Sequence, residues 1–391
     1  MHGFDEQVLR APKPVGSTEI EMDILIGICG IGNGHAIRQT SVIRWLDARG
    51  HRVFILATEQ SLRIMRTLFP EHAASEVFVP WVASHSHGVD FKMSACNDRN
   101  GKSAVYQENY AALARVDGFF AAKPDLVISD YEPTVAQYAY ANDRPLVTFD
   151  EQSKFLGYDF PPIENSTRQE EASRLRMFFP KAGLRLSCSF FPVVHPRDSH
   201  HRVDLVSPLL RNEFTASSIP QRGVPNQNEN RKRIVVYFSP YGSFGQNPQD
   251  VIEVLARFPH TQFQVFSDWC YKNVTVPDHV ELFGFDFCTF PIKLQEADGL
   301  ICTAGHTLLS EAFYLRKPVL AIPLDTFSQK VCAGMIEQLG LGFSHRELSF
   351  ESVSRFLNRL RDLQERGEVA WNKYEGSYPS VFQRLEDECG L

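Results

Sequence analysis

The chain has 391 residues, of which 43% are apolar and 22% charged, and its formal net charge is −7 at neutral pH. This length exceeds what one hydrophobic core usually organises, so two domains of roughly 150 to 200 residues are expected. The negative charge excludes a general nucleic-acid binder, which needs a basic face to neutralise phosphates. No apolar run approaches the roughly 18 residues that span a bilayer, so no stable membrane insertion is expected.

The N-terminal residues and the cysteines bear on where the protein works. Residues 1–22 mix charged residues with two prolines and lack an apolar stretch, which predicts a flexible tail rather than a secretory signal. The eight cysteines contain no C-x-x-C pair, and several fall within apolar runs. This pattern favours reduced, buried thiols over disulfides or a zinc site. We therefore expect a cytoplasmic protein.

Short apolar runs alternate with helix-like segments over residues 23–210, which we predict to be the N-terminal domain. The apolar runs predict strands at 24–29, 53–57, 126–129 and 145–149. A helix is predicted at 36–49 and ends at Gly50. This alternation indicates a doubly wound α/β sheet, in which ligands bind at the carboxyl ends of the strands.

A change in composition marks a boundary between two domains. Residues 211–233 are polar, rich in Asn, Pro and Gly, and nearly free of periodic apolar residues, so they predict a linker. The alternation then resumes and predicts a C-terminal domain over 234–391, whose last helix is a candidate to pack back on the first domain. Two irregular stretches, 80–102 and 154–168, are expected to be binding loops of the N-terminal domain.

A glycine-rich turn follows the first predicted strand. A dinucleotide fingerprint starting at Gly30 would need a glycine at its sixth position, where His35 stands. This argues against an NAD site. Glu59, just after the second predicted strand, could still serve as the ribose-binding acid of a dehydrogenase, so an NAD site stays open as an alternative.

The segment 297–329 has the pattern of a ligand loop. An apolar strand leads to Gly305 and a helix with an acidic residue, Glu311, one turn in. A second strand follows Lys317 and Pro318, and a polar loop ends at Gln329. The start of such a helix has unpaired N–H groups with a partial positive charge, which suits a phosphate without a metal.

This segment resembles the donor-binding motif of GT-B glycosyltransferases, most closely the branch that contains MurG and the related UDP-glycosyltransferases. The resemblance implies an α/β fold of the GT-B type, with two Rossmann-like doubly wound domains facing a central cleft. It implies that Glu311 holds the ribose and that Gln329 and Asp325 hold the sugar. It assigns the remaining donor contacts, mainly to the diphosphate and the base, to Gly305, His306, Thr307, Arg211, Gly242, Ser243, Phe283 and Phe285.

The first glycine turn resembles the G-x-G-G-H loop of the same transferases. The implied acceptor-binding residues are Gly32, Asn33 and Gly34, with His85 and His87 from the first irregular stretch. A neutral imidazole suits the removal of an acceptor proton, so His35 is the expected general base. Its carboxylate partner, or an alternative base, is expected among Asp130, Glu132 and Glu151, which all follow predicted strands.

These residues predict an inverting glycosyltransferase that moves a sugar, expected to be a hexose, from a nucleoside-diphosphate sugar to a small-molecule acceptor. The expected donor is a UDP-sugar, and the expected acceptor is a secondary metabolite or a nucleoside. No D-x-D pair is present, so neither a metal nor a cofactor beyond the nucleotide sugar is expected. A UDP-sugar 2-epimerase and a non-catalytic nucleotide-sugar-binding protein stay open as alternatives.

Overall fold

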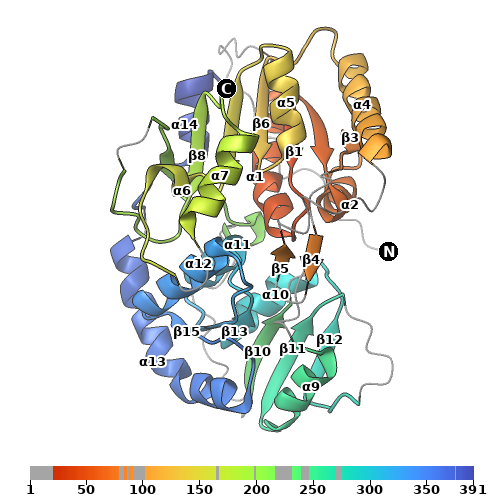
Figure 1. Cartoon of the computed structure of the whole chain (residues 1–391). Coiled ribbons are helices and arrows are strands. Elements are labelled where there is room, and N and C mark those ends of the chain that lie inside the picture. Colours follow the sequence, from red (N-terminus) through yellow and green to blue (C-terminus); the bar gives the residue numbers. More distant parts are fainter. Residues whose placement is uncertain are drawn as a thin grey trace.

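The protein has two lobes, each built on a parallel β-sheet (Figure 1). The computed structural model describes residues 21–78, 83–85, 88–90, 102–163, 167–197, 200–215, 231–238, 246–268, 275–374 and 376–391. Most of the expected N-terminal tail, residues 1–20, and most of the expected linker, residues 216–230, lie outside this part of the chain.

The first sheet has the order β3-β2-β1-β6-β7-β8-β9, and all its strands are parallel. Its strands are β1 (Asp23–Ile28), β2 (Arg52–Ala57), β3 (Ala73–Glu76), β6 (Leu126–Asp130), β7 (Leu146–Asp150), β8 (Leu184–Cys188) and β9 (Asp204–Val206). The chain builds outward from β1 to one edge and then restarts at β6 on the other side of β1. A sheet with this reversal has a crevice at the carboxyl ends of β1 and β6, where ligands bind.

The second sheet repeats this plan with the order β12-β11-β10-β13-β14-β15. Its strands are β10 (Lys232–Tyr237), β11 (Thr261–Phe266), β12 (Val280–Phe283), β13 (Gly299–Cys302), β14 (Val319–Ala321) and β15 (Gly342–Ser344). The order reverses between β10 and β13, so the second lobe has its crevice beside Tyr237 and Cys302. A separate antiparallel pair joins β4 (Ala83–His85) and β5 (Gly88–Asp90).

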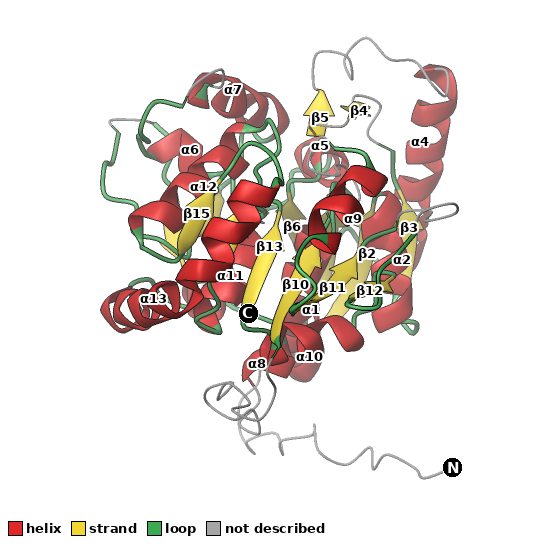
Figure 2. Cartoon of the chain, turned by 90° about the horizontal axis from the view of Figure 1, so that it is seen from below, coloured by secondary structure: helices red, strands yellow, loops and turns green. Residues whose placement is uncertain are grey.

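Helices flank the strands of both sheets (Figure 2). The first lobe contributes α1 (Gly34–Arg49), α2 (Glu59–Leu68), α4 (Lys102–Phe119), α5 (Pro133–Ala141), α6 (Lys154–Gly157) and α7 (Arg168–Phe178). The remaining helices are α8 (Asn212–Thr215), α9 (Pro248–Ala256), α10 (Thr289–Glu296), α11 (His306–Tyr314), α12 (Phe327–Gln338), α13 (Phe350–Tyr374) and α14 (Val381–Cys389). In the described part of the chain, no helix combines the length and apolarity of a membrane span.

The central strands are continuous apolar runs because helices cover both of their faces. All five residues of β6 and of β7 are buried, and so are the last five residues of β1. Gly50, expected to end the first long helix, is the C-cap of α1 with φ of +83°. A residue with a Cβ adopts this left-handed conformation at a cost, and glycine does not.

The last helix, α14, lies beside β8 of the first lobe (Figure 1). Its Val381 and Leu385 are fully buried in the same apolar cluster as Ile24 of β1. Phe382 stacks on Trp45 of α1, with ring centroids 5.1 Å apart. The C-terminal segment therefore ties the second half of the chain to the first lobe.

The expectation of an irregular loop over 154–168 is wrong at its start. Lys154 to Gly157 form α6, and all four residues are buried. The apolar side chains of Phe155 and Leu156 join the core, and Lys154 is held by a buried ion pair described below. Of the cysteines in the described part of the chain, Cys29, Cys188, Cys302 and Cys332 are buried thiols, and Cys288 is exposed.

Shortening Leu385 to alanine tests the contribution of α14. Leu385→Ala removes a fully buried side chain and leaves a cavity, so we expect a loss of about 2 to 5 kcal/mol in the free energy of unfolding. Urea titration measures the loss. The exposed Asp387 on the same helix is the control, and Asp387→Ala should stay within about 0.5 kcal/mol of the wild type. Equal effects of the two changes would show that α14 does not pack as described.

Candidate active site

The two crevices face each other across one cavity of about 190 Å³. Residues from both lobes line it, so each lobe supplies one wall. The first lobe contributes Gly32, Asn33, Gly34, His35, Arg38 and Glu151, among others. The second lobe and the linker before it contribute Arg211, Tyr237, Thr303, Gly305, His306, Thr307, Ser328 and Gln329, among others.

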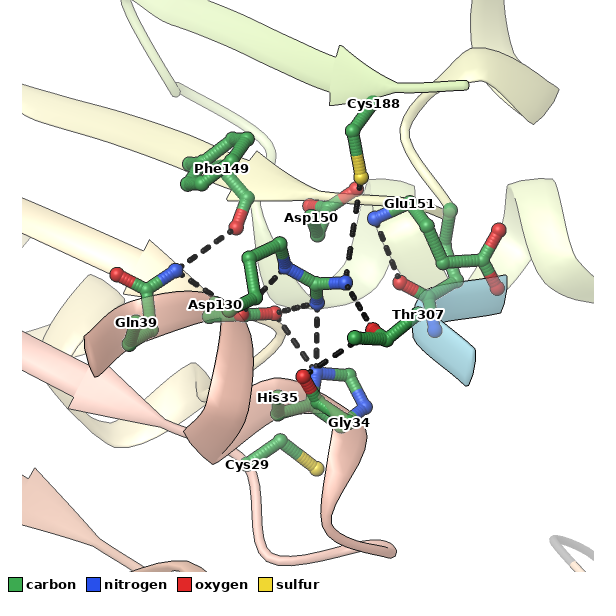
Figure 3. Close-up of polar contacts among 12 residues, drawn as sticks. Cys29, Gly34, His35, Gln39, Asp130, Phe149, Asp150, Glu151, Cys188 and Thr307 are labelled. Carbon is green, nitrogen blue, oxygen red and sulfur yellow. Dashed lines mark hydrogen bonds and ion pairs between the residues drawn. The ribbon is translucent and has the colours of Figure 1, made fainter. Parts of the chain in front are cut away.

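His35 and Asp130 meet at the carboxyl ends of β1 and β6 (Figure 3). His35 is the second residue of α1, and Asp130 is the last residue of β6 and has no exposed surface. His35 Nδ1 lies 2.7 Å from Asp130 Oδ1. A carboxylate only accepts, so His35 donates to Asp130 from Nδ1, and Arg38 Nη2 lies 3.1 Å from the same nitrogen. Nε2 is therefore the ring nitrogen of His35 left to act on a ligand.

Asp130 is held by two further residues of α1. Arg38 donates to both of its oxygens, from Nη2 to Oδ1 at 2.6 Å and from Nε to Oδ2 at 2.9 Å, and Gln39 Nε2 donates to Oδ2 at 2.9 Å. Burial alone would raise the pKa of Asp130, but the charges of Arg38 and His35 and their hydrogen bonds lower it below the ordinary value. Asp130 is therefore ionised. Arg38 and Gln39 were not predicted as site residues, although their i+3 and i+4 spacing from His35 places them on one helix face.

Polar contacts join the two walls of the cavity. Thr307 Oγ1 donates to the Gly34 carbonyl at 3.2 Å and accepts from Arg38 Nη1 at 3.4 Å (Figure 3). Asn33 Nδ2 donates to Tyr237 Oη at 2.9 Å. A Cβ at Gly34 would lie only 3.1 Å from Thr307 Oγ1, so glycine permits this close approach. The predicted acceptor loop and the predicted diphosphate loop are thus in direct contact.

The start of α11 is open to the cavity. Its N-cap residue, Gly305, has no side chain to bond the first N–H groups, and a Cβ placed there would meet no atom within 4 Å. His306 packs against Phe190, with ring centroids 5.2 Å apart. Burial and the nearby charges of Lys154 and Arg38 hold the pKa of His306 well below its ordinary value, so this ring is neutral. The helix start offers N–H groups and a partial positive charge, the features that bind a phosphate.

The other two acids proposed as partners of His35 have different contacts. Glu151 Oε2 lies 2.7 Å from Nζ of the fully buried Lys154, and Oε1 accepts from Ser328 Oγ of α12. Burial opposes its ionisation, but the Lys154 charge and these hydrogen bonds lower the pKa of Glu151 to about 2. Glu132 is the N-cap of α5 and accepts from two of its backbone N–H groups. Among the three candidates, Asp130 is the one that contacts His35.

Glu311 is buried and paired with Arg211. Its side chain has no exposed surface, and its Oε1 accepts from Arg211 Nε at 2.7 Å. Arg211, and not Glu311, lines the cavity. The role of Glu311 in holding the ribose stays a prediction, and in this structure Arg211 pairs with the buried carboxylate.

Of the other predicted donor-binding residues, one lines the cavity and three lie outside its lining. Gln329 lines the cavity, and its Oε1 accepts from the Leu324 N–H at 2.9 Å. Asp325 lies outside the cavity lining, is half exposed and pairs with Lys330 at 2.5 Å. Phe283 and Phe285 also lie outside the cavity lining. Phe283 stacks on Phe266, and Phe285 packs against Tyr237.

Four predicted residues cannot be placed in this site. Gly242, Ser243 and His87 lie outside the described residues, and of His85 only the backbone, in β4, is described. Within the described part of the chain no group of three His, Cys, Asp or Glu side chains is arranged to hold a metal ion.

Asp150, at the end of β7 beside the Asp130 cluster, makes a pH-dependent contribution to stability. Burial raises its pKa, hydrogen bonds from Ser153 lower it, and the Asp130 charge raises it further, to about 6. A carboxyl with a raised folded pKa stabilises the fold below its unfolded pKa, near 3.8, and this contribution is lost as pH rises through 6.

Asp150→Asn should remove this dependence. From pH 4 to pH 6.5 we expect the wild type to lose about 2 to 3 kcal/mol relative to the variant, because each pKa unit is worth about 1.4 kcal/mol. Urea unfolding at a series of pH values measures the difference. Parallel curves for the two proteins would contradict the assignment.

Comparison with known proteins identifies the family. The model of the family described as Glycosyl transferase family 1 matches residues 22–361. No curated protein matches the chain. Among solved structures, CalG4, the calicheamicin glycosyltransferase, is similar at 18% identity with a TM-score of 0.60, over 94% of this chain and 98% of that one.

Two further structures show the same likeness. The spinosyn rhamnosyltransferase SpnG is 14% identical with a TM-score of 0.62, over 93% of this chain and 100% of that one. SnogD from Streptomyces nogalater is 15% identical with a TM-score of 0.61, over 95% and 100%. At such identities the structural likeness establishes the fold, and the family match covers most of the chain. The chain therefore belongs to glycosyl transferase family 1 and is a glycosyltransferase of the GT-B fold.

Proposed function

We propose that this enzyme transfers a sugar from a nucleoside-diphosphate sugar to a small-molecule acceptor, with inversion and without a metal. The observation that carries the proposal is the His35–Asp130 pair, which faces the open start of α11 across one cavity. SpnG, a structural neighbour, has been solved with thymidine diphosphate and with its spinosyn aglycone. We propose a uridine nucleotide as the donor of this enzyme, with a thymidine nucleotide as the alternative.

The chemistry follows from the position of His35. The acceptor hydroxyl gives its proton to His35 Nε2 while its oxygen attacks the anomeric carbon. The bond from that carbon to the diphosphate oxygen breaks, and the nucleoside diphosphate leaves with the electron pair. Asp130 stabilises the imidazolium that forms.

The carboxylates of the site support a single displacement. A double displacement needs a free carboxylate as nucleophile, and in Glu151 both oxygens are engaged, one with Lys154 and one with Ser328. Asp130 is likewise surrounded by donors from α1. One attack on the anomeric carbon inverts its configuration.

The charge that develops on the leaving diphosphate has fixed partners on the wall that the second lobe and the linker supply. The start of α11 lines the cavity at Gly305, His306 and Thr307, and Arg211 lines it too. Preorganised donors of this kind stabilise developing negative charge without reorganisation. Arg38, which pairs with Asp130, also lines the cavity.

Replacing His35 tests the proposed base. We expect His35→Gln to lower kcat by about 10²- to 10⁴-fold, the usual contribution of a positioned base, and to leave the affinity for the nucleoside diphosphate unchanged. Steady-state kinetics and calorimetry measure the two quantities. His72, which pairs with Asp47 on the surface at 2.9 Å, is a matched control, and His72→Gln should keep full activity. Loss of nucleotide binding in His35→Gln would argue against a role limited to the base.

Ligand screening tests the donor. UDP or TDP, and the corresponding sugars, should raise the melting temperature, because a ligand that binds the native state stabilises it by mass action. The shift should persist in EDTA if the site works without a metal. Incubation with the donor alone should yield no new nucleotide sugar. Formation of an epimerised donor would contradict the transferase assignment.

A further inference from the structure

A second cavity, of about 210 Å³, lies between the lobes and shares no lining residue with the candidate active site. Its walls come from the segments that follow β8 and β9, from α11, and from the end of α13 with the residues after it. The segments after β9 and after α13 are the two places where the chain passes between the lobes. His306 separates the cavities, because it lines the first and packs against Phe190 of the second. Gly376 and Ser377 line the second cavity and are exposed, so it opens to solvent there.

The lining of this second cavity is aromatic and uncharged. Of the fifteen described residues that line it, seven are aromatic and none is Asp, Glu, Lys, Arg or His. An apolar cavity of about 150 Å³ holds one benzene molecule, so a volume of about 210 Å³ has room for one ring with a small substituent. A charged ligand would lose its hydration here and find no counter-ion in the lining. The lining therefore favours a small, neutral, aromatic molecule.

Trp371 adds a hydrogen-bond donor to this lining. Its indole Nε1 is buried and has no hydrogen-bond partner within the described part of the chain. The indole ring is held by edge contacts with Phe313 and Tyr314, at centroid distances of 5.2 and 5.3 Å, and by the guanidinium of Arg316, 5.0 Å from its centroid. A buried N–H group without a partner costs free energy, and an oxygen atom of a bound molecule would remove that cost.

The serine hydroxyl groups of the cavity complement this donor. Four serines line the cavity, and each donates its proton to a backbone carbonyl at 2.6 to 2.8 Å: Ser189, Ser207, Ser310 and Ser377. A hydroxyl oxygen whose proton is used in this way still accepts through its lone pairs. The cavity thus offers a ligand one unused donor and several oxygen acceptors. A hydroxyl group, which both accepts and donates, matches that combination.

We propose that this cavity is a second binding site, and that its ligand is a neutral phenol, one aromatic ring carrying a hydroxyl group. The ring packs among the aromatic side chains, the hydroxyl oxygen accepts from Trp371 Nε1, and the hydroxyl proton is donated to a serine oxygen of the wall. A methyl group in place of the hydroxyl group would make neither bond. The site is independent of the sugar transfer proposed above, because the two cavities share no residue.

Calorimetry with phenol, toluene and benzoate on the full chain at neutral pH tests the site. We expect phenol to bind with a dissociation constant of about 1 mM or lower, which is attainable for so few atoms. Toluene has the same size and lacks the hydroxyl group, so it should bind roughly 5- to 20-fold more weakly. Benzoate carries a charge and should not bind. Trp371→Phe keeps an aromatic ring and removes the N–H group, so it should lower the affinity for phenol to that for toluene and leave toluene nearly unchanged.

A second tryptophan provides the matched control. Trp45 of α1 stacks on Phe382, away from both cavities, and Trp45→Phe should leave the affinity for phenol unchanged. Leu210→Trp places a larger side chain in the wall of the second cavity, so it should abolish the binding of both phenol and toluene. This variant also tests the site if Trp371→Phe fails to fold.

Four results would overturn the inference. The wild type would bind no phenol at several millimolar, or it would bind phenol and toluene equally well. Phenol binding that Trp371→Phe leaves unchanged would show that the indole N–H group is not its partner. Phenol binding that persists in a folded Leu210→Trp would place the ligand elsewhere, for example in the active-site cavity.

Discussion

The site depends on one buried carboxylate, that of Asp130. An ionised carboxylate without water is costly unless it is paired and hydrogen-bonded, and the cost is several kcal/mol. One stretch of α1 supplies all that is needed: the ring of His35, the guanidinium of Arg38 and the amide of Gln39. The requirement to satisfy Asp130 therefore also fixes the orientation of His35. The positions of β1 and β6 at the reversal of the sheet bring the two sides together.

The same cluster reaches the second lobe. Arg38 donates to Thr307, Thr307 donates to Gly34, and Glu151 accepts from Ser328. These are directional hydrogen bonds at the cavity, and their geometry depends on how closely the lobes approach. Since the base belongs to one lobe and the diphosphate site to the other, the approach of the lobes sets the distance between the reacting groups. Effective transfer needs this distance held to within a fraction of an ångström.

The choice among the acids shows where sequence reasoning stops. Asp130, Glu132 and Glu151 all stand at or just after predicted strands, and nothing in their local sequence separates a partner of His35 from a helix cap or an ion pair. Strand order sets Glu151 apart, because β6 lies next to β1 and β7 does not. Glu132, two residues after β6, serves instead as the N-cap of α5. Glu311 shows the same limit. The sequence motif identifies Glu311 as a candidate site residue. Its hydrogen bond from Arg211, 100 residues earlier in the chain, depends on how the segment between the lobes packs against α11.

Local patterns in the sequence determined the class of the fold, four strands of the first sheet within one or two residues, the end of α1 at Gly50, and the glycine turn with His35. These follow from periodicity, from the backbone freedom of glycine and from the burial of apolar runs, which are properties of neighbouring residues. The tertiary structure alone decided that Asp130 is the partner of His35, that Lys154 is buried with Glu151, and that Arg211 stands over Glu311. Each of these contacts involves a buried ionisable group. Asp130 and Glu311 receive their partners from distant parts of the chain, and the neighbours Glu151 and Lys154 are buried together by contacts with Ser328 and Cys188.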